Sequence, residues 1–242
     1  MAPLVSAVPP SVPLTPGPLS WLRRHAVFPL LVACAGSSGL SVMLLVARKL
    51  MTGQGRLGFI PFNLILAFLP LAFLLLFERS QKRSHAVICA GLWLLFFPNA
   101  PYMLTDLVHF DKRMGPASWL DLMALVAAAW AALLGGMITL HFMENRVRLH
   151  RPVWVGHGFV LTVLFLTSIG IYIGRFLRFH SWHALLQPID LLRETAACFL
   201  QPGRDPMAWP FTLGVFGLLC CIHYSLQAFV HAARPERRIA GT

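Results

Sequence analysis

The sequence predicts an all-α membrane protein: a bundle of about six transmembrane helices, with an amphipathic helix at the membrane surface between the fifth and sixth spans. Three observations support this fold class. Of the 242 residues, 57% are hydrophobic and only 12% are charged, about half the charged share of a soluble domain. Several apolar stretches approach or exceed the roughly 20 residues that cross a bilayer. Short basic clusters stand at the ends of these stretches, as expected for side chains that face lipid headgroups.

Six apolar stretches are expected to span the membrane, and they cover residues 26–47, 58–77, 86–97, 119–143, 153–174 and 207–230. The third stretch ends at a proline and is too short to cross a bilayer alone, so we expect it to continue through residues 98–101 or to pack as a broken helix. Small residues at 36–39 in the first stretch, and Ala128, Ala132 and Gly136 in the fourth, predict faces for tight helix contact.

One membrane domain, residues 21–233, is expected between two tails. Residues 1–20 contain six prolines and no charged residue, which favours a disordered, extended tail, and residues 234–242 form a basic tail expected in the cytoplasm. Apolar residues at helical spacing predict an amphipathic helix over residues 188–200, lying near the membrane plane or packed on the bundle. Its apolar stripe comprises Ile189, Leu192, Ala196 and Phe199.

The distribution of basic residues predicts the sidedness and the partners. Six spans place both termini on one side, which would carry eleven of the twenty Lys and Arg residues, so both termini are predicted to be cytoplasmic. The formal net charge of +11 is interpreted as membrane anchoring. No nucleic-acid partner is expected, because the sequence predicts no basic stripe on a folded domain. Membrane lipid is the expected partner.

A polar stripe follows the third span. Residues at offsets of 0, 3, 7 and 10 lie on one face of a helix, and four polar residues have this spacing in an otherwise apolar segment. They are Asn99, Tyr102, Asp106 and His109, and Thr105 stands next to Asp106. Asp106 and His109 are the candidate catalytic base and acid, and the other three are candidate binding residues.

A second polar segment follows the fifth span and emerges on the same side. Arg175, Arg178 and Trp182 share a helical face, and Ser181 precedes the tryptophan. Arginine is costly in hydrocarbon unless it is paired or faces a polar cavity. We therefore expect Asp106 to lie within about 4 Å of at least one of the two arginines. Arg175, Arg178, Ser181 and Trp182 complete the set of candidate binding residues.

Both polar segments resemble motifs of a known family. Residues 97–109 read F-P-N-A-P-Y-x-x-T-D-L-x-H, and residues 174–182 read G-R-F-L-R-x-x-S-W. They are similar to motifs of an uncharacterised family of bacterial inner-membrane proteins that is described as a domain of unknown function. The resemblance covers about residues 30–230 and implies a bacterial multi-spanning protein without an assigned activity. Where this chain has His180 and His183, the family more often has Asn and Asp.

Four functions fit these residues, and the sequence does not decide whether the protein is an enzyme. A structural role, in which Asp106 neutralises an arginine and staples two helix ends, is favoured. An enzyme or lipid-phosphate-handling protein would bind a lipid or an anionic headgroup through its arginines. A small transporter would use the broken third span. A metal or haem site would combine Asp106 with His109, His180 and His183, but this spacing matches no template, so no metal is predicted and the cofactor is unknown.

Overall fold

The computed structural model describes residues 28–53, 55, 57–110, 117–149, 151–179, 186–201 and 203–232. Throughout these ranges the regular structure is helical. The elements are α2 (Phe28–Thr52), α3 (Ile60–Arg79), α4 (Arg83–Phe96), α5 (Asn99–Thr105), the 3-10 helix η1 (Asp106–His109), α6 (Ser118–Arg148), α7 (Val153–Tyr172), the π-helix η3 (Ile173–Leu177), α9 (Pro188–Leu200) and α10 (Ala208–Ala232). The two predicted tails, Ser181 and Trp182 lie outside the described residues.

Six segments are long and apolar enough to cross a membrane, which confirms the predicted fold class. They are Phe28–Thr52, Ile60–Arg79, Arg83–His109, Ser118–Arg148, Val153–Leu177 and Ala208–Ala232. The third of them joins α4, α5 and η1 into 27 residues. The short apolar stretch therefore continues through the proline-containing segment 98–101, which was the first of the two arrangements predicted for it. The chain is an all-helical, multi-pass membrane protein.

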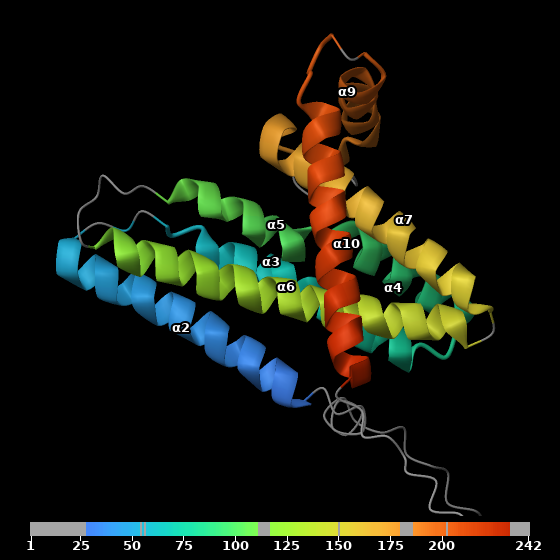
Figure 1. Cartoon of the computed structure of the whole chain (residues 1–242), viewed down its shortest axis with the longest axis horizontal. Coiled ribbons are helices and arrows are strands. Elements are labelled where there is room, and N and C mark those ends of the chain that lie inside the picture. The colour runs from blue at the N-terminus through green and yellow to red at the C-terminus, as the bar shows by residue number, and fades with distance from the viewer. Residues whose placement is uncertain are drawn as a thin grey trace, which may run out of the picture.

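The long helix α6 forms the centre of the bundle. In its most apolar window 72% of the residues are buried, compared with 11% in α2 and in α10. It packs against α2, α3, α5 and α7 (Figure 1). The predicted small face of α6 receives α5: Ala128 and Ala132 are fully buried, and a Cβ added to Gly136 would lie 2.7 Å from the Cβ of Ala100. Only glycine at this position lets the two backbones come so close.

Polar contacts attach α2 to one side of α6. The hydroxyl groups of Ser37 and Ser41 each donate a hydrogen bond of 2.8 Å to a backbone carbonyl of α6. Ser37 belongs to the small-residue segment 36–39, so a close contact predicted there is confirmed for Ser37, whereas a Cβ added to Gly36 or Gly39 would meet no atom within 4 Å. Near the other end of α2, Arg48 and Asp121 are both buried and form an ion pair, with 2.5 Å between Nε and Oδ1. Each charge is neutralised by the other inside the bundle.

The predicted amphipathic helix is α9, which lies beyond the upper end of α10 in Figure 1. Phe199 packs edge-on against Tyr172 of α7, with ring centroids 5.2 Å apart. The Tyr172 hydroxyl donates to the carboxylate of Asp205, and this hydrogen bond holds the pKa of Asp205 below its usual value. Ile189 and Leu192 of the predicted stripe are 77% and 68% exposed. They face away from the bundle, and the position of α9 near the membrane plane stays a prediction.

Replacing Gly136 by Ala should lower the melting temperature of the detergent-solubilised protein, because the new methyl group overlaps Ala100. Overpacking of this kind costs about 1–3 kcal/mol. The double variant Gly136→Ala, Ala100→Gly should recover most of the loss, since it removes the opposing methyl group. Gly91→Ala is the matched control, because a Cβ there meets no atom within 4 Å. An unchanged melting temperature for Gly136→Ala would contradict the close seating of α5 on α6.

Candidate functional site

The site begins at a break in the third span. Pro98 and Pro101 have no amide hydrogen, so two of the regular helical hydrogen bonds cannot form between α4 and α5. The side-chain amide of Asn99 donates a hydrogen bond of 2.9 Å to the backbone carbonyl of Phe96, which satisfies one acceptor at the break. On the opposite side, a Cβ added to Gly170 of α7 would come within 3.1 Å of Pro98. The broken segment is therefore held between glycines of α6 and α7.

The polar stripe of the broken span lines a cavity. Asn99, Tyr102, Asp106 and His109 all border a cavity of about 480 Å³, which confirms that they share one face. Asn63 of α3 and Arg175 of η3 complete its polar part. The remaining wall is mainly aliphatic and comes from α3, α4, α7, η3 and α9. Its aliphatic side chains are Leu66, Leu94, Leu95, Leu166, Ile169, Ile173 and Leu191, and Phe59, Pro98, Gly170, Gly174 and Phe179 also border the cavity.

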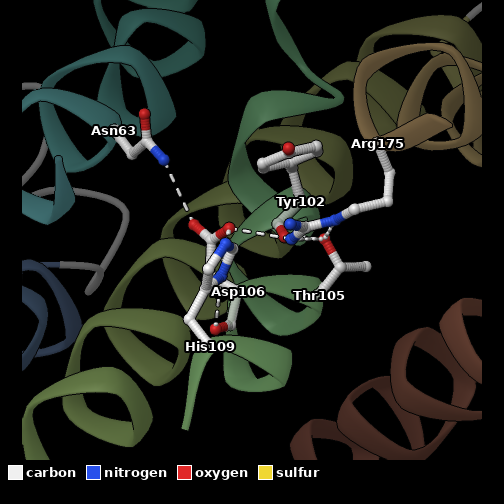
Figure 2. Close-up of polar contacts among 6 residues, drawn as sticks. All are labelled: Asn63, Tyr102, Thr105, Asp106, His109 and Arg175. Atoms are coloured by element: carbon white, nitrogen blue, oxygen red, sulfur yellow. Dashed lines mark hydrogen bonds and ion pairs between the residues drawn. The ribbon is translucent and has the colours of Figure 1, made fainter. Parts of the chain in front are cut away.

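Asp106 is the centre of the polar part and connects three elements. Its side chain is only 2% exposed. Oδ1 lies 2.8 Å from Nη2 of Arg175, and Oδ2 accepts a hydrogen bond of 3.1 Å from the Asn63 side chain (Figure 2). The predicted ion pair between Asp106 and one of the two arginines is thus confirmed for Arg175. Both carboxylate oxygens have a donor, as burial of this charge requires.

Arg175 is held in place from several directions. Its Nε and Nη2 atoms donate to the Thr105 hydroxyl at 3.2 and 2.6 Å, and its Cζ atom lies 4.8 Å from the ring centroid of Tyr102. The residue belongs to the π-helical turn η3, which departs from the regular path of α7. Turns of this kind occur often at functional sites. The hydrogen bonds to Thr105 and Asp106 use Nε and Nη2 and leave Nη1 as a further donor.

His109 stands at the border of the cavity. Its Nδ1 lies 3.1 Å from the backbone carbonyl of Asp106 and 3.8 Å from Oδ1 of the same residue. A carbonyl only accepts, so Nδ1 carries the hydrogen of this contact. The ring packs against Phe59 with 5.1 Å between centroids, and the side chain is 42% exposed. His109 is therefore oriented and accessible.

The other predicted residues lie elsewhere. Arg178 has a left-handed backbone (φ 57°), is exposed and does not border the cavity. Ser181, Trp182, His180 and His183 lie outside the described residues. Within the part that is described, no three His, Cys, Asp or Glu side chains form a group that could hold a metal. Asn63 was missed by the sequence analysis, where its only signal was an amide side chain in an otherwise apolar span.

Removing one member of the buried pair should destabilise the protein strongly. Asp106→Asn and Arg175→Gln should each cost about 3–5 kcal/mol, because the remaining partner stays buried without its counter-charge. The double variant should lose less than the sum of the two single variants, which a double-mutant cycle of thermal stability in detergent measures. Glu194→Gln breaks an exposed pair with Arg204 and should change stability by less than about 1 kcal/mol. Strictly additive losses for Asp106 and Arg175 would show that the two charges are not coupled.

Comparison with known proteins agrees with the expected membership in a family of unknown function. No curated protein and no solved structure matches the chain. One family does match, over residues 62–222, and its description is protein of unknown function (DUF1361). The matched range contains most of α3, the broken third span, α6, α7 and most of α10, and thus every described residue of the cavity except Phe59. The chain belongs to the DUF1361 family of proteins of unknown function.

Proposed function

We propose that the protein binds a membrane lipid, or another amphiphile with an anionic headgroup, in the cavity beside the Asp106–Arg175 pair. One observation carries this proposal. The same cavity of about 480 Å³ has charged and hydrogen-bonding side chains on one part of its wall and aliphatic side chains on the rest. A ligand that fits such a wall has a polar head and an apolar body.

The polar part suits an anionic headgroup, such as a phosphate or a carboxylate. Arginine binds both groups through parallel N–H donors, and Arg175 has donors beyond those that contact Thr105 and Asp106. The carboxylate of Asp106 already neutralises the charge of Arg175. Protonation of His109 would add a positive charge to the wall and would therefore strengthen the attraction for an anion. Asn99 and Tyr102 add neutral polar groups to the same wall. The headgroup is thus recognised mainly by hydrogen bonds.

The apolar part suits a hydrocarbon chain. Leu166 of this wall is 45% exposed, so the aliphatic end of the cavity reaches the outer surface of the bundle. In a multi-pass protein this surface faces lipid. A lipid could place its head beside Arg175 while its chain leaves the cavity past Leu166.

The ion pair has a structural role within the same proposal. Asp106 joins η1 to α3 through Asn63 and to η3 through Arg175, so it fixes three walls of the cavity. The structural role favoured by the sequence and the binding role therefore belong to one arrangement. The pair holds the helix ends, and the cavity that they enclose takes the ligand.

A second candidate is an enzyme that acts on the bound amphiphile. The geometry of His109 supports it, because Nδ1 is oriented by the Asp106 carbonyl while the side chain is 42% exposed at the border of the cavity. In this case His109 is the general acid–base, and Asp106 orients it rather than acting as the base. Turnover of a bound lipid would separate this candidate from simple binding.

Filling the apolar part of the cavity should displace the ligand. Lipids that remain bound to the purified protein in mild detergent would be quantified by native mass spectrometry. Leu166→Trp should reduce retained lipid by about tenfold or more, which corresponds to a loss of at least 1.4 kcal/mol. Leu161→Trp is the matched control, since Leu161 lies on the same helix, is 40% exposed and does not border the cavity. Equal retention by both variants would place the bound lipid elsewhere.

We also propose that the protein lies in a bacterial inner membrane with both termini on the cytoplasmic side. This orientation puts the Asp106 cavity in the outer half of the membrane. Support comes from the excess of basic residues on the terminal side. Reporter fusions after residue 242 and within residues 111–118 should report opposite sides, with the first one cytoplasmic. Two fusions on the same side would remove one span from the topology.

A further inference from the structure

A second buried polar cluster lies at the opposite end of the spans. It joins the last turns of α6 to α10 and is centred on Glu144, which is fully buried. With six spans, α6 crosses from the side on which the Asp106 segment emerges to the side expected for both termini, so we infer that Glu144 lies in the terminal-side half of the membrane. His223 of α10 lies beside it and is 2% exposed. Ionisable side chains in such positions are costly and often mark proton or ion sites.

The contacts around Glu144 leave its charge weakly compensated. Its closest cation is Arg148, one turn further on α6, with 3.5 Å between Nη1 and Oε1. This arginine side chain is 34% exposed, so it is partly solvated. Oε2 accepts a hydrogen bond from the Gln227 amide and lies 3.6 Å from Nε2 of His223. By comparison, Asp106 has a guanidinium nitrogen at 2.8 Å.

The Gln227 amide defines the protonation state of the cluster. Its nitrogen, not its oxygen, must face Glu144, because the oxygen would be repelled by the carboxylate. The same nitrogen lies 2.9 Å from Nε2 of His223. An amide nitrogen only donates, so Nε2 accepts and the imidazole is neutral. His223 therefore has a lone pair that is held next to a buried carboxylate.

A cavity of about 540 Å³ borders this cluster. It lies beside the crossing of α6 and α10, where α10 runs across α6 rather than alongside it in Figure 1, and Leu30 of α2 forms part of the wall. The polar residues of the wall are His141, Asn145, His223, Gln227 and His231. Both His223 and its hydrogen-bond partner thus face a space large enough for several water molecules.

We propose that Glu144 and His223 form a proton-binding site, which takes one proton from the terminal side of the membrane through this cavity. A hydronium ion transfers its proton to Nε2 of His223, and the hydrogen bond from Gln227 to that nitrogen breaks. The new Nε2–H then donates to Oε2 of Glu144, which is 3.6 Å away before this change. The imidazolium forms an ion pair with the carboxylate, and the net charge of the cluster rises by one.

Other titratable and charged groups surround His223. On α6, Arg148 pairs with Glu144 and His141 borders the same cavity as His223, while His157 of α7 lies 3.4 Å from the Tyr224 hydroxyl of α10. Arg148 and any protonated histidine oppose the added charge. Glu144 favours it and is the closest group of either sign. The proposal thus requires that Glu144 controls the protonation of His223.

The test follows the imidazole nitrogens of the full-length protein, labelled with ¹⁵N-histidine, by NMR as the pH is lowered. The His223→Gln variant identifies the His223 signals. In the wild type, His223 should be neutral with hydrogen on Nδ1 at high pH and should become protonated at lower pH. In Glu144→Gln the pH of half-protonation should fall by about one unit or more, because the stabilising negative charge is gone. In Gln227→Leu it should rise, because the neutral ring loses its donor.

Glu78→Gln provides the matched control. Glu78 lies at the same end of the bundle and pairs with Arg146 at 3.2 Å, without a contact to His223. This change should leave the titration of His223 unaltered. Equal titrations in Glu144→Gln and Glu78→Gln would overturn the proposal. A His223 ring that stays neutral over the whole pH range in which the wild type remains folded would overturn it too, and this second measurement does not depend on the folding of the Glu144 and Gln227 variants.

Discussion

The cost of burying a charge in hydrocarbon governs the region around Asp106. A carboxylate at this depth is tolerated only if donors reach both of its oxygens. Arg175 and Asn63 supply these donors from the fifth and the second span. The break in the third span and the π-helical turn at the end of α7 are the local departures from regular helix that bring Asp106 and Arg175 together. Both of these departures contribute residues to the wall of the cavity.

Sequence periodicity was sufficient where one helix determines the result. The common face of Asn99, Tyr102, Asp106 and His109 follows from helical spacing, and the number of spans brings their segment to the same end as Arg175. The small face of α6 was found in the same way. The choice between Arg175 and Arg178 was not accessible, because it depends on the π-helical turn, which shifts the register of the residues that follow it. The role of Asn63 depends on a contact between separate helices and had no periodic signal.

The second polar cluster shows the same limit more clearly. His141, His157 and His223 appear in the sequence as single histidines in or near apolar spans, and such residues usually form hydrogen bonds between helices. His157 does contact another helix, through the Tyr224 hydroxyl of α10, but His223 has its hydrogen bond to Gln227 on its own helix and lies 3.6 Å from Glu144 of α6. The convergence on Glu144 arises because α10 crosses α6 and packs along α7. The angle at which two helices cross depends on the shapes of all the side chains along their contact. The spacing of residues within one helix therefore cannot predict it.

The separation of the paired charges along the chain has a consequence for membrane insertion. A nascent chain enters the bilayer from its N-terminal end, and 69 positions separate Asp106 from Arg175. The third span is thus made well before its counter-charge exists, and it has the lowest mean hydropathy of the six, 1.6. Of the two side chains that donate to Asp106 in the folded protein, only Asn63 has been synthesised by then. We therefore expect the third span to reach its final position only after the fifth span has been inserted. Packing of the bundle around Asp106 would then be completed by its C-terminal spans.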